Sequence, residues 1–262
     1  MSKIGVSTAC FYPMYTEKAL EEVSTLGVSV CEIFLNCFSE LEKPFLEKLR
    51  GILRAGNLSV TSIHPFLSAM EGYLFFSSYD RRTDDGIEIY KKMFYAAQYL
   101  GAEYFVLHGA HGLVCNNVEE YAESYRRIAR AANEFGITLT HENVCRTVSN
   151  SVDFIRKFKK SLNNDVSFTF DIKQCIRAGQ NPLEMIDAMG DCIQNVHIND
   201  YDLEKKECRL PLCGNCDISG IIEKLKSYGY NGNYIIEVYN DNYSSKDEIS
   251  VSAQRLESFI NC

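Results

Sequence analysis

The chain has 262 residues, of which 46% are hydrophobic and 24% are charged, proportions that are ordinary for a folded globular protein. Its formal net charge of −8 argues against a nucleic-acid partner, because proteins that bind nucleic acids usually carry a basic surface. The sequence has no apolar run of membrane-spanning length, no secretory signal, and 11 cysteines without framework spacing, so we expect a cytoplasmic protein with reduced thiols and no membrane partner.

Short apolar or β-branched runs alternate with longer segments of helical spacing about eight times. The predicted strands are residues 3–8, 28–35, 59–64, 104–108, 138–142, 167–171, 193–198 and 234–238. The predicted helices are residues 16–26, 39–55, 84–100, 118–135, 152–162, 182–189, 218–228 and 246–260. Most of these strands lack polar alternation, which suits a parallel sheet covered on both faces.

Eight β/α units predict an α/β fold of one domain, residues 1–262, closed as a (β/α)8 TIM barrel. A doubly wound open sheet is the alternative architecture. Such a sheet would normally carry a glycine-rich phosphate loop after its first strand, whereas residues 9–13 read ACFYP. The closed barrel is therefore the favoured fold.

Histidine or an acid stands at the end of six successive predicted strands, and strand ends on one face of a barrel form its active site. These residues are His64, His108, Glu142, Asp171, His197 and Glu237. Buried carboxylates repel one another unless a cation compensates them. We therefore predict that the last four bind one divalent metal ion. Three carboxylates and one imidazole favour Mn²⁺, Mg²⁺ or Co²⁺, with Zn²⁺ as the alternative.

Five sequence strings now point to a family: HEN at 141–143, FD at 170–171, VHIND at 196–200, LPLCGNCDIS at 210–219 and IIEVY at 235–239. In this order they resemble the xylose-isomerase-like TIM-barrel superfamily, which includes sugar phosphate isomerases, ketose epimerases and the family 2 AP endonucleases. The resemblance spans essentially the whole chain. It implies a metal-dependent isomerase or epimerase that acts on a small ketose or related α-hydroxyketone through an enediolate.

Within that resemblance, Glu142 and Glu237 are the expected acid/base pair. His64 and His108 are expected near the substrate, with the alternative that they brace the metal ligands. Family members often have a histidine three residues after the aspartate, and that position is Gln174 here. We expect Gln174 to donate a hydrogen bond to the substrate in its place. Arg209 is the expected cation from the following loop, and pairing of barrels into a homo-oligomer is expected from the family.

Three other functions stay open. An inosose-dehydratase-like lyase would use the same proton removal but expel a hydroxyl group. An endonuclease IV-like repair enzyme is less favoured, because Gln174 replaces one histidine ligand and residues 202–211 contain no histidine. A sugar-binding barrel without activity is the third.

The remaining polar signals have ordinary structural interpretations. We expect Lys173 to point outward as a surface lysine, with the alternative that it binds a carboxylate or phosphate group of the substrate. The Cys213-Gly-Asn-Cys216 spacing lies in a family-like loop rather than at a helix start, which argues against a redox or zinc motif. Basic runs near Arg126 and Arg156 are predicted to be solvated helix faces. Phe11, Phe66 and Tyr239 are candidates for an apolar wall beside a sugar ring.

Overall fold

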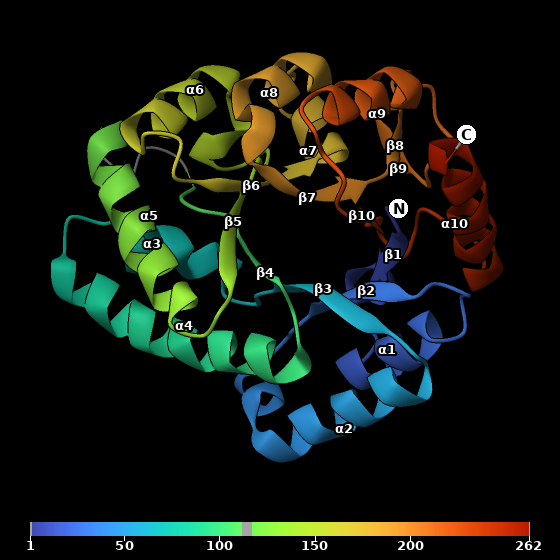
Figure 1. Ribbon diagram of the computed structural model, residues 1–262, viewed down its shortest axis with the longest axis horizontal. Coiled ribbons are helices and arrows are strands. Elements are labelled where there is room, and N and C mark those ends of the chain that lie inside the picture. Colours follow the sequence, from blue (N-terminus) through green and yellow to red (C-terminus); the bar gives the residue numbers. More distant parts are fainter. Residues whose placement is uncertain (1, 112–116, 262) are drawn as a thin grey trace.

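The computed structural model describes residues 2–111 and 117–261, and its centre is a closed barrel of eight parallel strands (Figure 1). The strands follow the order β1-β10-β7-β6-β5-β4-β3-β2 around the ring. Their bounds are β1 Ile4–Ser7, β2 Val30–Phe34, β3 Ser59–His64, β4 Tyr104–Leu107, β5 Thr138–Glu142, β6 Ser167–Asp171, β7 Ile193–Ile198 and β10 Tyr234–Ile236. Because β1 pairs with both β2 and β10, the predicted (β/α)8 TIM barrel is confirmed and the open sheet is excluded.

Helices form the outer layer around this ring (Figure 1). They are α1 Thr16–Val23, α2 Lys43–Ala55, α3 Glu71–Phe75, α4 Asp80–Leu100, α5 Val118–Asn133, α6 Val152–Ser161, α7 Ile172–Arg177, α8 Pro182–Met189, α9 Ile218–Ser227 and α10 Lys246–Asn261. The apolar side chains of these helices and of the strands form a continuous core between the two layers. This arrangement leaves the carboxyl ends of the strands free to carry polar residues.

Several element boundaries differ from the sequence prediction. The helix predicted over 39–55 begins at Lys43, because Pro44 has no backbone N–H to contribute and favours the first helical turn. The last strand ends at Ile236, so Glu237 lies just beyond it. Two short helices, α3 and α7, and the antiparallel pair β8 (Asp200–Asp202) and β9 (Glu207–Arg209) were not predicted. All of these unpredicted elements are too short to leave a periodic pattern.

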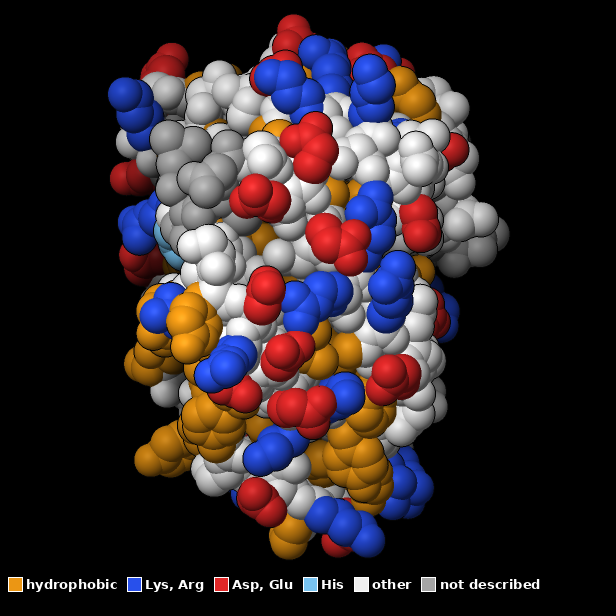
Figure 2. All heavy atoms as spheres, turned by 90° about the vertical axis from the view of Figure 1, so that its left-hand side faces the viewer, with side chains coloured by type: hydrophobic (Ala, Val, Ile, Leu, Met, Phe, Trp, Pro, Cys, Tyr) orange, Lys and Arg blue, Asp and Glu red, His pale blue; other side chains and the backbone are white. Residues whose placement is uncertain are grey.

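The outer helices carry mixed charge rather than a basic surface. Figure 2 views the side of the molecule on which α5 lies, and acidic and basic side chains are interspersed there. On α5, Arg126 pairs with Glu123 at 2.9 Å and Arg127 pairs with Asp84 at 2.6 Å. These contacts support the interpretation of this basic run as a solvated helix face.

Candidate metal centre

Four candidate ligands meet at the carboxyl ends of neighbouring strands. Glu142 ends β5, Asp171 ends β6, and His197 is the next-to-last residue of β7. Glu237 follows β10 directly. One ligand atom from each residue lies within 4.8 Å of the others. The structure therefore brings together the complete set that the sequence predicts for a single metal ion.

His197 is the centre of this group. Its Nδ1 lies 3.6 Å from Glu142 Oε1, 3.7 Å from Asp171 Oδ2 and 3.4 Å from Glu237 Oε2. These separations are too long for strong hydrogen bonds, and Nδ1 has no hydrogen-bond partner among the described residues although it is buried. A buried imidazole nitrogen that faces three carboxylate oxygens fits a shared divalent cation.

The other ring nitrogen of His197 is held by Glu32, a residue that the sequence analysis missed. Glu32 lies in β2, is fully buried, and accepts hydrogen bonds from His197 Nε2 at 2.8 Å and from Ser62 Oγ at 2.7 Å. This contact places the proton on Nε2 and leaves Nδ1 facing the carboxylates. A glutamate inside the otherwise apolar strand VCEIF was the signal that could have found it.

Replacing Glu32 with glutamine tests this orienting role. The amide keeps nearly the same shape but no longer fixes the proton of His197 on Nε2, so we expect divalent-metal affinity to fall about 10- to 100-fold with the barrel intact. Isothermal titration with Mn²⁺ measures the affinity, and circular dichroism checks the fold. An affinity equal to that of the wild-type protein would show that His197 needs no orienting carboxylate.

Lys173 lies in the centre of the site, and the prediction that it points outward is wrong. Its side chain is only 2% exposed, and its Nζ lies 2.5 Å from Asp171 Oδ2 and also contacts Glu237 Oε2. Burial by itself would lower the pKa of Lys173, but the two carboxylates outweigh burial and raise the pKa well above its usual value. The short helix α7 causes this placement, because it turns Lys173 back over the strand ends.

The two carboxylate oxygens of Asp171 make different contacts. Its Oδ1 caps α7 by accepting the backbone N–H of Gln174 at 2.9 Å, whereas Oδ2 faces His197 and Lys173. Asn143 fixes the Asp171 backbone by accepting its N–H at 2.8 Å and donating to its carbonyl at 2.9 Å. The carboxylate is thus set rigidly before any ligand arrives.

Two of the predicted substrate contacts are turned away from the metal centre. The side-chain oxygen of Gln174 accepts the backbone N–H of Cys145 at 3.1 Å, toward the loop after β5. Arg209 lies on β9 and pairs with Glu207 at 2.5 Å. Since the sequence could not place either side chain, their proposed substrate contacts stay predictions without geometric support.

His64 and His108 lie next to Glu142, beside the quartet of candidate ligands formed by Glu142, Asp171, His197 and Glu237. Glu142 Oε2 lies 3.1 Å from His108 Nε2 and 3.7 Å from His64 Nε2, and the two Nε2 atoms are 2.9 Å apart. These three residues form a second group whose ligand atoms converge within 4.8 Å. Burial would raise the pKa of Glu142, but hydrogen bonds from the histidines outweigh it and hold that pKa well below its usual value.

The position of His108 depends on Glu71, a buried residue of α3. Glu71 Oε2 accepts the backbone N–H of His108 at 2.8 Å and of Gly109 at 2.6 Å, and its Oε1 accepts the Tyr90 hydroxyl at 2.7 Å. Gly109 has a φ of +85°, and a Cβ there would collide with the Tyr121 hydroxyl group. Only glycine therefore fits this turn, which brings His108 beside Glu142.

A cavity of about 360 Å³ opens beside the metal centre. Its lining residues are Ala9, Tyr12, Phe34, Asn36, His64, Phe66, Lys173, Glu237, Val238 and Tyr239. Two of the three predicted wall aromatics, Phe66 and Tyr239, are among them, whereas Phe11 is buried and packs edge-on against Tyr243. Arg209 is not among these lining residues, which combine apolar and aromatic side chains with Asn36, His64, Lys173 and Glu237.

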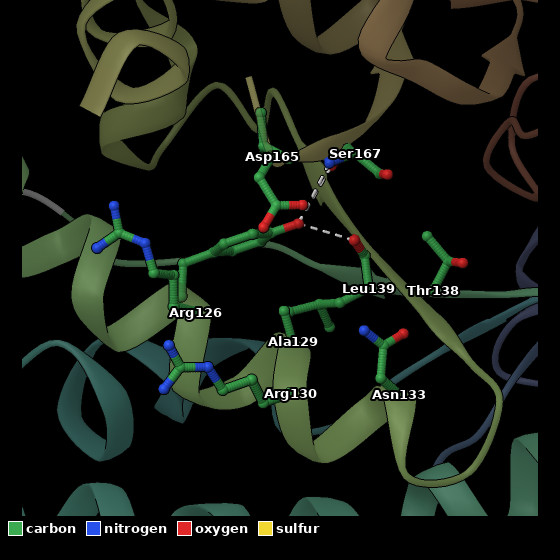
Figure 3. A pocket seen from close by; sticks show the side chains of 10 residues that line it. Arg126, Ala129, Arg130, Asn133, Thr138, Leu139, Asp165 and Ser167 are labelled. Atoms are coloured by element: carbon green, nitrogen blue, oxygen red, sulfur yellow. Dashed lines mark hydrogen bonds between the residues drawn. The ribbon is translucent and has the colours of Figure 1, made fainter. Parts of the chain in front are cut away.

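A second cavity, of about 160 Å³, lies at the opposite ends of β5 and β6 (Figure 3). Tyr125 lines it and donates a hydrogen bond to the carbonyl oxygen of Leu139 at 2.8 Å, and Arg126, Arg130 and Asp165 are also among its lining residues. The amino-terminal end of a barrel generally serves stability rather than catalysis. The metal centre and its cavity are therefore the candidate functional site.

The Cys213 and Cys216 pair lacks the properties of a redox or zinc motif. Both are free thiols. Burial raises the pKa of Cys216 to about 12, whereas a reactive thiol requires a lowered pKa. Within residues 2–111 and 117–261, neither of the two groups able to hold a metal contains a cysteine. The donor atoms of the candidate centre are therefore nitrogen and oxygen.

The fold and site together define a TIM barrel with a candidate centre for a divalent metal. The chain matches the Xylose isomerase-like TIM barrel family over residues 20–259, and it belongs to that family. It is 24% identical over 266 residues to an uncharacterized protein of Mycobacterium leprae, with 94% of this chain and 92% of that protein covered.

In the part of the chain that the structure describes, no helix is long and apolar enough to cross a membrane.

Solved structures of sugar epimerases share the fold. D-psicose 3-epimerase from Clostridium cellulolyticum H10 has a TM-score of 0.78 at 16% identity, covering 99% of this chain and 98% of that one. The 3-keto-D-glucoside 4-epimerase from E. coli has a TM-score of 0.76 at 17% identity, covering 98% and 100%. A D-tagatose 3-epimerase-like protein has a TM-score of 0.77 at 20% identity, covering 99% and 98%. At these identities the similarity establishes the architecture.

Proposed function

We propose that this protein is a divalent-metal-dependent epimerase or isomerase that acts on a small ketose or a related α-hydroxyketone. The observation that carries the proposal is the convergence of Glu142, Asp171 and Glu237 on the Nδ1 atom of His197 at the mouth of the barrel. The cavity beside it, about 360 Å³, has a size suited to a small molecule. The sugar epimerases with the same architecture support this class of substrate.

The four ligands would hold one divalent ion, which supplies a Lewis acid for the substrate carbonyl and compensates the charge left by proton removal. The donor set favours Mn²⁺, Mg²⁺ or Co²⁺.

The chain itself supplies the proton transfers. Glu237 borders the cavity, and Glu142 belongs to the same group of four candidate ligands. Burial opposes ionisation of Glu237, yet Lys173 and His197 outweigh burial and hold its pKa well below its usual value, so the group is a carboxylate at neutral pH. One glutamate, as the carboxylate, takes the proton next to the carbonyl. The other glutamate, after taking up a proton from solvent, returns a proton to the same or the neighbouring carbon, and the first glutamate then releases its proton to solvent. Return to the opposite face gives epimerisation, and transfer along one face gives isomerisation.

The side chains that line the cavity would bind the rest of the substrate. Phe34, Phe66 and Tyr239 provide apolar surface, and Asn36 provides a polar group at the same cavity. This combination of aromatic surface with few polar groups is common in small-molecule sites. The sugar would therefore lie between these side chains and Glu237.

Exchange in heavy water tests the proposal. The purified protein is loaded with Mn²⁺, Mg²⁺ or Co²⁺ in turn and incubated with a panel of ketoses in D₂O. We expect deuterium at the carbon next to the carbonyl of at least one ketose, measured by NMR and mass spectrometry. A protein that binds metal but exchanges no ketose proton would contradict the proposal. A new conjugated-carbonyl absorbance would instead indicate the dehydrating lyase.

Phosphodiester hydrolysis is not favoured, although His64, His108 and Glu142 form a second group of potential ligands. The endonuclease branch that these residues resemble would also need a histidine at the position of Gln174. Gln174 is hydrogen-bonded to the Cys145 backbone instead. We therefore expect a DNA duplex with an abasic site to remain uncut.

A further inference from the structure

The Lys173 ammonium occupies the same carboxylate oxygens that would coordinate a metal ion. Asp171 Oδ2 and Glu237 Oε2 are the oxygens that face His197 Nδ1, at 3.7 and 3.4 Å. They are also the two oxygens that Lys173 contacts. A metal ion bound by the four candidate ligands and the Lys173 ammonium group would therefore compete for the same two oxygen atoms.

Among residues 2–111 and 117–261, Asp171 and Glu237 are the only charged side chains that pair with Lys173. Among the described residues, its only further hydrogen bond is a 3.4 Å contact with the Glu237 carbonyl oxygen. Its Nζ also lies 5.7 Å from the centre of the Tyr239 ring, and both residues line the 360 Å³ cavity. The side chain thus has open space and an aromatic face to move toward when its carboxylates are taken by another cation.

The Lys173 ammonium group compensates part of the negative charge of the site. The described site gathers Glu32, Glu142, Asp171 and Glu237, all nearly buried. Without a cation these carboxylates would repel one another strongly in a water-poor environment. An ammonium that bridges two of them keeps the ligands assembled while the metal ion is absent.

We propose that Lys173 is an internal counter-ion that competes with the divalent metal for Asp171 and Glu237 and moves to the cavity wall when the metal binds. This inference rests on the proposed metal centre and adds a regulatory element to it. The metal affinity of the wild-type protein is then lower than the four ligands alone would give. The displaced ammonium becomes a hydrogen-bond donor on the wall that faces the substrate.

The first test replaces Lys173 with methionine and measures Mn²⁺ affinity by isothermal titration. Removal of the competing charge is expected to increase the affinity about tenfold or more. The melting temperature of the metal-free variant should fall by several degrees, while that of the metal-saturated variant stays near the wild-type value. Lys159→Met is the matched control, because Lys159 is a half-buried lysine of α6 that donates a hydrogen bond to the Met189 carbonyl oxygen at the end of α8, away from the site. An unchanged or weaker Mn²⁺ affinity in Lys173→Met would overturn the proposal.

A second test uses the wild-type protein and so does not depend on the folding of a variant. Lysine acetylation at one fixed pH is followed residue by residue with mass spectrometry, in EDTA and in saturating Mn²⁺. We expect Lys173 to be protected without metal and to be labelled at least severalfold faster with it, while Lys159 is labelled equally in both. Equal or slower labelling of Lys173 in Mn²⁺ would contradict displacement.

The two proposals can fail separately. A wild-type protein that exchanges ketose protons, combined with a Lys173→Met variant of unchanged affinity, would refute the counter-ion and leave the proposed function standing. Tighter binding of Mn²⁺ by Lys173→Met without exchange of any ketose would refute the proposed function and support the counter-ion.

Discussion

Replacing Glu142 with glutamine is expected to lower turnover about a thousandfold while the barrel stays folded. Glu142 Oε1 faces His197 and its Oε2 faces His108, so the change removes both a metal ligand and one member of the acid/base pair. The amide preserves volume, and the surrounding core remains packed. The measurement is the rate of deuterium incorporation at saturating Mn²⁺, with bound metal quantified in the same samples.

Two further variants help to interpret the Glu142→Gln measurement. Glu237→Gln should show a loss of similar size, because Glu237 is the other member of the pair. Glu134→Gln is the matched control, since Glu134 is exposed on the outside of the barrel and should retain full activity. If both Glu142→Gln and Glu237→Gln turn over at the wild-type rate, neither carboxylate transfers the proton.

Removal of divalent ions is expected to abolish activity and to lower the melting temperature. A ligand present at 100 times its dissociation constant stabilises the folded state by about 2.7 kcal/mol, which corresponds to roughly 5–8 °C for a chain of this size. Dialysis against EDTA followed by differential scanning calorimetry measures the shift. Addition of Mn²⁺, Mg²⁺ or Co²⁺ should restore both properties.

A variant that cannot bind the metal ion is the control for this experiment. The Asp171→Asn variant keeps the hydrogen bond to the Gln174 N–H but loses the charge on the oxygen that faces His197, so EDTA should hardly change its melting temperature. Full activity of the wild-type protein in EDTA, with no metal detected by elemental analysis, would rule out a metal-dependent mechanism.

The barrel and its quartet could be predicted from the sequence because both depend on strong local signals. Each long helix has an apolar stripe, and the four candidate ligands stand at or beside the ends of strands that parallel topology must bring together. Strand order alone then places Glu142 and Asp171 next to each other, since β5 pairs with β6. Their convergence in the structure follows from these rules, while their catalytic roles remain predictions.

The side chains that the sequence analysis missed or could not orient depend on packing rather than on pattern. Lys173 lies on the short helix α7, which starts directly after Asp171 and has too few residues to show a periodicity, so the sequence could not give the direction of its side chain. Glu71 reaches the His108 backbone from α3, a helix of one turn. Gln174 lies beside the site in sequence, but its side chain is used by the Cys145 backbone. A side chain's direction in such short segments is set by tertiary contacts, which the order of residues does not reveal.

The pairing of β1 with β10, which closes the barrel, also affects how the chain folds during synthesis. Ile4 pairs with Tyr234, so this edge of the first strand stays open until Tyr234 has been synthesised. An open strand edge is a site for wrong pairing and aggregation in a nascent chain. Because Glu237 directly follows the strand that closes the barrel, barrel closure and completion of the ligand set depend on the same segment of the chain.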